Sequence, residues 1–144
     1  KTIKDFTNLA IGKKVWNAHV VIGSMIKFEV GEEVEKGRGE YHFWVDCCHW
    51  WLQQGEGKNF IDIVHSESCN DNLNTLIQIL NGKKVLNVQY NDEIQGWTIY
   101  FDEQFFLRMS PYAGEKVRSV WHVGNSISLL NIMSDGTLTT ELLK

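Results

Sequence analysis

Residues 42–51, with the sequence HFWVDCCHWW, bring together side chains that could do chemistry. Two histidines, an aspartate and the adjacent Cys47 and Cys48 lie within ten positions. Thiolates and imidazoles are the usual ligands of zinc, and adjacent cysteines can form a strained disulfide. The stretch therefore raises three readings, namely a metal site, a redox site or a densely packed strand.

The spacing favours the packed strand. Successive side chains of a strand point to opposite faces, so Cys47 and Cys48 would diverge and could not share one zinc ion. A reducing compartment also disfavours a disulfide between them. We therefore predict no metal and no cofactor. On a single strand over residues 40–52, one face would carry Tyr41, Phe43, Val45, Cys47, His49 and Trp51, and the other His42, Trp44, Asp46, Cys48 and Trp50.

The second of these faces is a candidate binding surface. Unless helices cover it, Trp44 and Trp50 would form an aromatic surface, with Asp46 as a polar group. His49 on the first face is expected to be a hydrogen-bonded core histidine. Trp44, Asp46 and Trp50 are therefore predicted partner-binding residues.

Acidic side chains form a second candidate surface. Glu32, Glu33 and Glu35 lie in the glycine-containing segment 30–40, and Asp92 and Glu93 lie in a second polar loop. Clustered carboxylates suit a basic partner, because opposite charges steer association. The alternative is a solvated loop that only keeps the protein in solution.

Motifs of common enzymes are absent from the sequence. It contains no G-x-S-x-G, no G-x-x-x-x-G-K-[ST] and no G-x-G-x-x-G motif. His65 and Cys69 are four positions apart and could pair as base and nucleophile, but the sequence indicates no third group to orient the histidine. The sequence therefore predicts a protein that is not an enzyme.

Composition narrows the class of partner. The 144 residues carry a formal net charge of -4, which argues against a nucleic-acid binder. No apolar run approaches the length of a membrane span, and the first residues lack the apolar core of a signal peptide. Three cysteines make a poor disulfide framework, so we expect a cytoplasmic protein.

An internal repeat organises the chain. GKKVWN at 12–17 matches GKKVLN at 82–87 at all but one position, and helical apolar spacing precedes both. Forwards, the match pairs Phe28 with Phe101. We therefore predict a single domain, 1–144, made of pseudo-symmetric halves 1–69 and 70–144.

Each half is expected to begin with a short helix and continue as strands. Gly12 and Gly82 suit the left-handed position that ends a helix, and Asn70 or Asp71 would cap the second helix. Closely spaced alternating segments with turn signals predict an α+β fold of mainly antiparallel β-strands. The expected core is Trp16, Ile26, Phe28, Leu86, Val88, Ile99 and Phe101.

The chain resembles small uncharacterised bacterial proteins of the toxin-immunity type. These often carry a G-x-x-V-x-x-V strand, an L-x-F-D/E strand and tryptophan-containing strands. The matching stretches are IGKKVWNAHV, IKFEVGEE and FWVDCCHWW, then NGKKVLNVQY, IYFDEQFFLRMS and SVWHVGN. The resemblance implies a non-enzymatic cytoplasmic protein that binds and neutralises a cognate toxin domain. It carries over no binding residues.

Other readings stay open beside this one. A β-rich module could bind a small ligand in an aromatic pocket between the halves, lined by Trp16, Trp44, Trp97 or Trp121. A third option is an enzyme that uses His49 or His122. The oligomeric state does not follow from the sequence.

Overall fold

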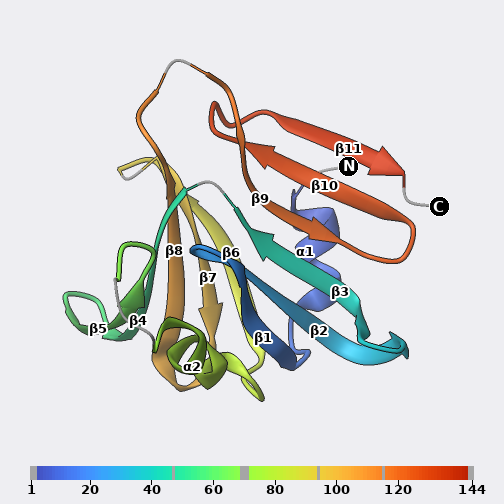
Figure 1. Ribbon diagram of the computed structural model, residues 1–144, viewed down its shortest axis with the longest axis horizontal. Coiled ribbons are helices and arrows are strands. Elements are labelled where there is room, and N and C mark those ends of the chain that lie inside the picture. Colours follow the sequence, from blue (N-terminus) through green and yellow to red (C-terminus); the bar gives the residue numbers. More distant parts are fainter. Residues whose placement is uncertain (1–2, 47, 69–71, 94, 115, 143–144) are drawn as a thin grey trace.

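The computed structural model describes residues 3–46, 48–68, 72–93, 95–114 and 116–142 (Figure 1). Over this part of the chain the structure is mainly antiparallel β, in two sheets with two short α-helices. The α+β class predicted from the sequence is confirmed. None of the described helices has the length and apolar character needed to cross a membrane.

The first sheet has the strand order β1-β2-β3-β9-β10-β11, and all neighbouring strands are antiparallel. Its middle pair, β3 and β9, joins the N-terminal strands to the C-terminal ones. The strands are β1 (Val15–Ile22), β2 (Met25–Glu35), β3 (Arg38–Val45), β9 (Ser119–Gly124), β10 (Ser128–Met133) and β11 (Leu138–Leu142).

The second sheet has the order β5-β4-β8-β7-β6 and is also antiparallel throughout. Here β4 and β8 join the two parts of the chain. The strands are β4 (Cys48–Glu56), β5 (Asn59–His65), β6 (Val85–Asn91), β7 (Gly96–Phe101) and β8 (Phe105–Pro111), with a 3-10 turn at Asp102–Gln104.

Two short helices each contact strands of both sheets. Helix α1 (Ile3–Ala10) contacts β6 and β9, and α2 (Leu73–Ile77) contacts β1 and β5. A 3-10 turn, Gln78–Leu80, continues α2. The buried residues of α1 recur at helical spacing, which explains why this segment is an amphipathic helix: Ile3, Phe6, Thr7 and Ala10.

Side chains of both sheets meet in one aromatic core. Phe28 and Phe43 stack at 5.1 Å in the first sheet, and the ring of Phe101 in the second sheet lies edge-on at 6.0 Å from Phe28. Trp121 stacks on Phe43 at 6.2 Å and contacts Trp97 of the second sheet at 5.7 Å. Such pairs add to the hydrophobic stabilisation from burial and hold the sheets together.

The expected strand over residues 40–52 is two strands. β3 ends at Val45 in the first sheet, and β4 begins at Cys48 in the second. Because the chain changes sheets here, the alternation of faces does not continue across the break. The expected common face of Trp44 and Trp50 is therefore wrong.

Irregularities in β1 and β6 change the expected core. Asn17 has a φ of +53°, and the pairing register shifts after Trp16, so that Trp16 is half-buried. A shift in β6 leaves Leu86 47% exposed. These two core predictions are wrong: the buried side chains before and after each shift are three positions apart, at Val15 and Ala18 and at Val85 and Val88, so the residue after the first valine points outward. The remaining expected core residues are buried: Ile26, Phe28, Val88, Ile99 and Phe101.

The two GKKV segments lie side by side and exchange backbone hydrogen bonds. The Gly12 N–H donates to the Val85 carbonyl at 2.7 Å, and the Gly82 N–H donates to the Val15 carbonyl at 2.8 Å. Both glycines have positive φ, at +86° and +88°. Their predicted left-handed conformation is confirmed, whereas the predicted caps at residues 70–71 lie outside the described residues.

The expected correspondence between the two repeats is shifted by two residues in the strands that follow. Val15 pairs with Val30, whereas Val85 pairs with Phe101. Phe101 therefore takes the place of Val30 rather than that of Phe28.

Candidate functional site

The β2–β3 hairpin extends beyond the edge of β1 and borders a hollow of about 540 Å³. Gly12, Lys13, Lys14 and Trp16 form one wall, and residues 31–33 with Glu40 form the other. Glu32, Glu33 and Glu35 are all exposed on this hairpin. The hollow thus contains two of the three glutamates singled out in this segment.

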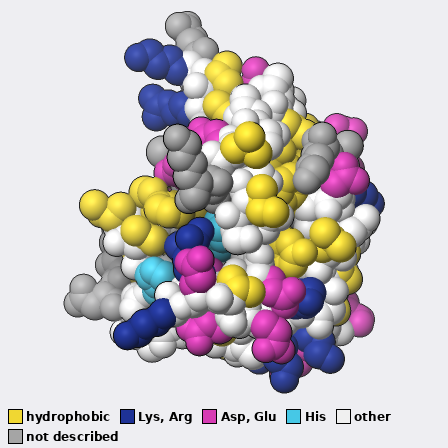
Figure 2. All heavy atoms as spheres, turned by 90° about the vertical axis from the view of Figure 1, so that its right-hand side faces the viewer, with side chains coloured by type: hydrophobic (Ala, Val, Ile, Leu, Met, Phe, Trp, Pro, Cys, Tyr) yellow, Lys and Arg dark blue, Asp and Glu magenta, His cyan; other side chains and the backbone are white. Residues whose placement is uncertain are grey.

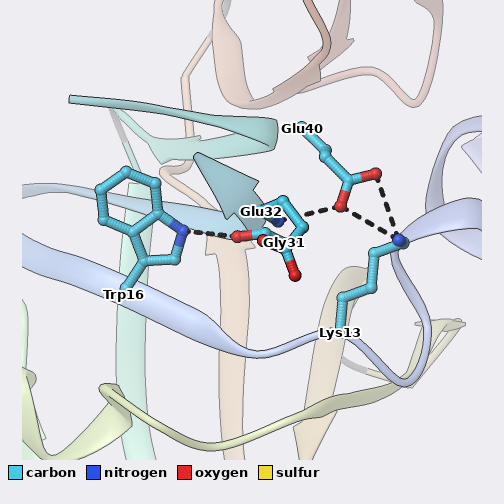
Figure 3. Close-up of polar contacts among 5 residues, drawn as sticks. All are labelled: Lys13, Trp16, Gly31, Glu32 and Glu40. Carbon is cyan, nitrogen blue, oxygen red and sulfur yellow. Dashed lines mark hydrogen bonds and ion pairs between the residues drawn. The ribbon is translucent and has the colours of Figure 1, made fainter. Parts of the chain in front are cut away.

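An ion pair between two lining residues, Lys13 and Glu40, spans the two walls of the hollow (Figure 3). The Lys13 Nζ lies 3.1 Å from both carboxylate oxygens of Glu40. The Glu32 backbone N–H donates to the Glu40 Oε1 at 2.9 Å. This N–H, followed by the Lys13 ammonium, lowers the pKa of Glu40 from its ordinary value. Glu40 is therefore an ionised structural carboxylate.

Gly31 makes this arrangement possible. The Trp16 Nε1–H donates to the Gly31 carbonyl at 2.7 Å, which orients the indole beside the hollow (Figure 3). Gly31 has a φ of +88°, and a Cβ there would lie 2.6 Å from the Glu40 Oε1. Only glycine combines this backbone conformation with this close approach.

Cations already pair with part of the acidic cluster. Arg38 lies 3.6 Å from Glu35, and Figure 2 shows acidic and basic side chains interleaved over the lower part of this face. Glu33 accepts a hydrogen bond from the Gly37 N–H at 2.8 Å. Among the described residues, no cation forms an ion pair with Glu32 or Glu33. These two carboxylates are available to an incoming cation.

Trp44 and Asp46 lie on the outer face of the first sheet. Trp44 is half-buried, with the Lys27 Nζ 5.6 Å from its ring centroid. The Asp46 Oδ2 lies 3.6 Å from the His122 Nε2 and accepts from the Ser119 hydroxyl at 3.5 Å. Among the described contacts, the Ser119 hydroxyl donates to the Asp46 carboxylate and not to the His122 imidazole. The arrangement therefore differs from that of a serine activated by histidine.

The first sheet also buries a histidine beside Trp44. His42 is 9% exposed, and burial lowers its pKa to about 4, with the positive charges of Lys27 and Arg38 adding to the effect. Its Nε2 lies 2.8 Å from where a Cβ on Gly124 would be. His42 is thus a neutral side chain packed on backbone at neutral pH.

Trp50 is a core residue, so its prediction as an exposed binding residue is wrong. Its side chain is fully buried, and its Nε1–H donates to the Ser24 carbonyl at 2.7 Å. The error follows from the change of sheet between β3 and β4. The new strand starts its own alternation and directs Trp50 inward.

Asp92 and Glu93 are exposed in the turn after β6, and the Glu93 N–H donates to the Asn91 side chain at 2.9 Å. Lys84, directly before β6, forms an isolated β-bridge with Lys14, which lines the hollow. From there β6 runs away from the hollow. The turn with Asp92 and Glu93 therefore lies at the other end of β6 from the hollow.

Metal-binding groups do not gather in the described part of the chain. No set of three His, Cys, Asp or Glu side chains there could hold a metal ion. Cys48 is a buried thiol. Cys47 and Cys69, which the sequence interpretation also considered, lie outside the described residues.

The tryptophans of the predicted aromatic pocket lie in different places. Trp97 and Tyr90, whose rings meet at 5.1 Å, line a cleft of about 590 Å³ that also borders α1 and Leu138. Trp121 is buried behind Trp97. Trp16 and Trp44 contribute to neither wall of this cleft.

The acidic side of the hollow is visible in the sequence, where Glu40 clusters with Glu32 and Glu33, but the role of Lys13 is not. Lys13 belongs to a segment that the sequence marks only as a repeat, and its partner Glu40 is 27 positions away. Gly31 carried the one usable signal, because a glycine inside an alternating strand often marks a bulge or a close approach.

Comparison with known proteins adds no family assignment. The chain matches no family model, and no curated protein or solved structure shows significant similarity to it.

Proposed function

We propose that the protein is a non-enzymatic cytoplasmic binding protein that docks a basic protein partner at the hollow beside the β2–β3 hairpin. The partner would be a toxin domain, as the resemblance to immunity proteins implies. The observation that carries this proposal is the position of Glu32 and Glu33, two exposed carboxylates without an ion pair among the described residues, beside Trp16.

The hollow suits a lysine or arginine side chain. Glu32 and Glu33 would receive the cationic group, and the Trp16 ring could contact it through a cation–π interaction. Trp16 and Glu40 are already held by hydrogen bonds, so little ordering is needed on binding. Glu35 and the surface of Trp44 and Asp46 would extend the contact along the first sheet.

The test is charge reversal at the hollow. We expect the double variant Glu32→Lys with Glu33→Lys to keep its fold, because exposed charges contribute little to stability. It should slow association with a basic toxin domain and reduce the salt dependence of the rate. Stopped-flow or surface-based kinetics and protection of toxin-expressing cells are the measurements.

A matched control separates local from global charge. Glu67→Lys with Glu141→Lys changes the net charge equally at exposed positions outside the hollow. This control should retain protection and most of the association rate. If both double variants behave alike, or neither changes binding, the hollow is not the docking site. Reversal of Asp92 and Glu93 tests separately whether the partner reaches the far turn.

A small-ligand function is the second candidate, favoured by the cleft at Tyr90 and Trp97. Its volume of about 590 Å³ lies within the usual range for small-molecule sites, and its walls are largely aromatic and aliphatic. Native mass spectrometry of the purified protein tests it. A retained small molecule that is lost in Trp97→Ala would favour this function over protein binding.

We also propose that residues 1–69 and 70–144 are pseudo-symmetric halves. The reciprocal hydrogen bonds at Gly12 and Gly82 support this reading, as does the exchange of strands, since β4 and β5 complete the sheet of β6–β8. The halves should then fold only together. Co-expression of both segments should yield a stable complex, whereas two independently folded halves would contradict the proposal.

A further inference from the structure

A second hollow, of about 430 Å³, lies on the outer face of the second sheet. Thr98 and Tyr100 of β7 and Phe106 and Arg108 of β8 line its floor. Arg108 is the one cationic residue among its described lining residues. This hollow is separate from the hairpin hollow and from the Tyr90–Trp97 cleft.

Neighbouring side chains hold Arg108 in position. Its Nε–H donates to the Gln53 Oε1 at 2.8 Å, and the Gln53 amide donates in turn to the Asp62 Oδ1 at 2.5 Å. The guanidinium lies over the Trp51 ring at 4.8 Å. Gln53 is 2% exposed, so this chain of contacts is anchored in the sheet. The stacked, hydrogen-bonded Arg108 loses less freedom on binding than an unrestrained side chain would.

The remaining donors of Arg108 define the ligand chemistry. Gln53 takes the Nε–H, and the described contacts leave the Nη donors to a ligand. A planar fork of N–H groups binds a carboxylate in two parallel hydrogen bonds. Tyr100 and Phe106, whose rings lie 6.2 Å apart, offer an apolar surface next to it.

Glu56, the acidic residue that lines the hollow, should repel a carboxylate ligand at Arg108 only weakly. Glu56, which accepts from the Gln104 amide at 2.7 Å, lies beyond the level of Phe105 in the pairing of β4 with β8. Phe105 is three positions from Arg108, which corresponds to about 10 Å along a strand. Repulsion across this distance is weak near a protein surface.

We propose that this hollow binds the carboxylate of a small acid with an apolar or aromatic group. Arg108 clamps the carboxylate, Trp51 and Gln53 position the guanidinium, and the apolar group lies over Tyr100 and Phe106. The carboxylate can come from a free organic acid or from the C-terminal residue of a peptide.

Titrations of the ¹⁵N-labelled protein test the site. The probes are 3-phenylpropionate, its uncharged amide 3-phenylpropionamide, and an acetylated tetrapeptide ending in phenylalanine. We expect the Trp51 indole and Arg108 Nε signals to shift with at least one carboxylate probe. The acid should bind at least about tenfold more tightly than its amide, because the charged pair is the stronger contact. Preference for the peptide identifies a C-terminal residue as the source, and preference for the free acid identifies a metabolite.

Variants complete the test. Arg108→Gln should weaken acid binding at least about tenfold, and Arg108→Lys should also weaken it, because lysine lacks the fork. The matched control is Arg118→Gln, which removes an exposed arginine elsewhere. Equal binding of acid and amide, equal loss in the control, or no shift with any probe would overturn the proposal. The comparison of acid with amide uses the native chain, so it stands even if a variant unfolds.

Discussion

Lys13 and Glu40 are 27 positions apart, and the lysine Nζ lies 3.1 Å from both oxygens of the carboxylate. The contact joins the segment after α1 to β3 and connects the two walls of the hairpin hollow. Both side chains are partly exposed, at 36% and 27%. The pair therefore shapes the hollow more than it stabilises the fold, because solvent screens such ion pairs.

Gly31 should tolerate alanine less well than Gly37. Both have positive φ, at +88° and +80°, but a Cβ at Gly31 would meet Glu40, whereas nothing lies within 4 Å at Gly37. Gly37→Ala should cost about 1–2 kcal/mol for the left-handed backbone alone.

Gly31→Ala should cost more than this, because Glu40 must also move. Urea unfolding of both variants gives the two free energies. Equal losses would mean that Glu40 moves aside freely and that the glycine is needed for its backbone conformation only.

Ionisation of Glu40 should make the free energy of unfolding depend on pH. Its folded pKa lies below the ordinary value of 4.5, so its contribution is present above that pH and is lost as the pH falls through the folded pKa. Glu40→Gln should therefore be less stable than the native protein at about pH 7, and the difference should shrink as the pH falls from 4.5 through the folded pKa. Melting of both proteins across this range measures it. A constant difference would show that the Lys13 contact and the Glu32 N–H do not favour the ionised form.

The sequence was informative where a local pattern decides the structure. Helical spacing located α1, the glycines at 12 and 82 marked the helix ends, and alternation identified Phe28 and Val88 as buried. These features depend on near neighbours in the chain, so composition and period suffice to predict them.

The errors arose where tertiary structure interrupts a pattern. Residues 40–52 alternate without a turn signal, and nothing local shows that the chain changes sheets before Trp50. The positive φ of Asn17 was also not predictable, because Asn adopts this conformation more often than most residues but still only in a minority of cases. The contact of Lys13 with Glu40 depends on the fold as a whole.

Phe101 and Leu86 should differ sharply when truncated. Sequence alternation predicted both as core residues, but Phe101 is 2% exposed and Leu86 is 47% exposed. Phe101→Ala should lower the free energy of unfolding by about 3–5 kcal/mol, because it leaves a cavity beside Phe28. Leu86→Ala should cost less than about 1 kcal/mol, because its side chain is largely in water already.

Denaturant melts of these two variants compare them directly. A large loss in Leu86→Ala would mean that the shift in β6 is absent in solution. A small loss in Phe101→Ala would mean that the two sheets do not pack at this ring.

His42 should titrate far below an ordinary histidine. Burial, then Lys27 and Arg38, lowers its pKa from 6.5 to about 4. Because the pKa of His42 is lower in the folded state than in the unfolded state, the folded state binds the proton only at a lower pH. Stability should therefore be full above pH 6.5 and fall as the pH drops towards about 4. The chemical shifts of the imidazole protons, followed by NMR against pH, give the value directly.

Lys27 offers a way to test the cause of this shift. Lys27→Gln removes the positive charge that contributes most to the shift, so the pKa of His42 should rise while burial still keeps it below 6.5. The matched control is Lys36→Gln, an exposed lysine on the β2–β3 hairpin that is not among the causes of the shift. It should leave the titration of His42 unchanged. A native titration at or above 6.5 would show that the imidazole is hydrated, and that the outer face of the first sheet is more open than the packing of His42 on Gly124 indicates.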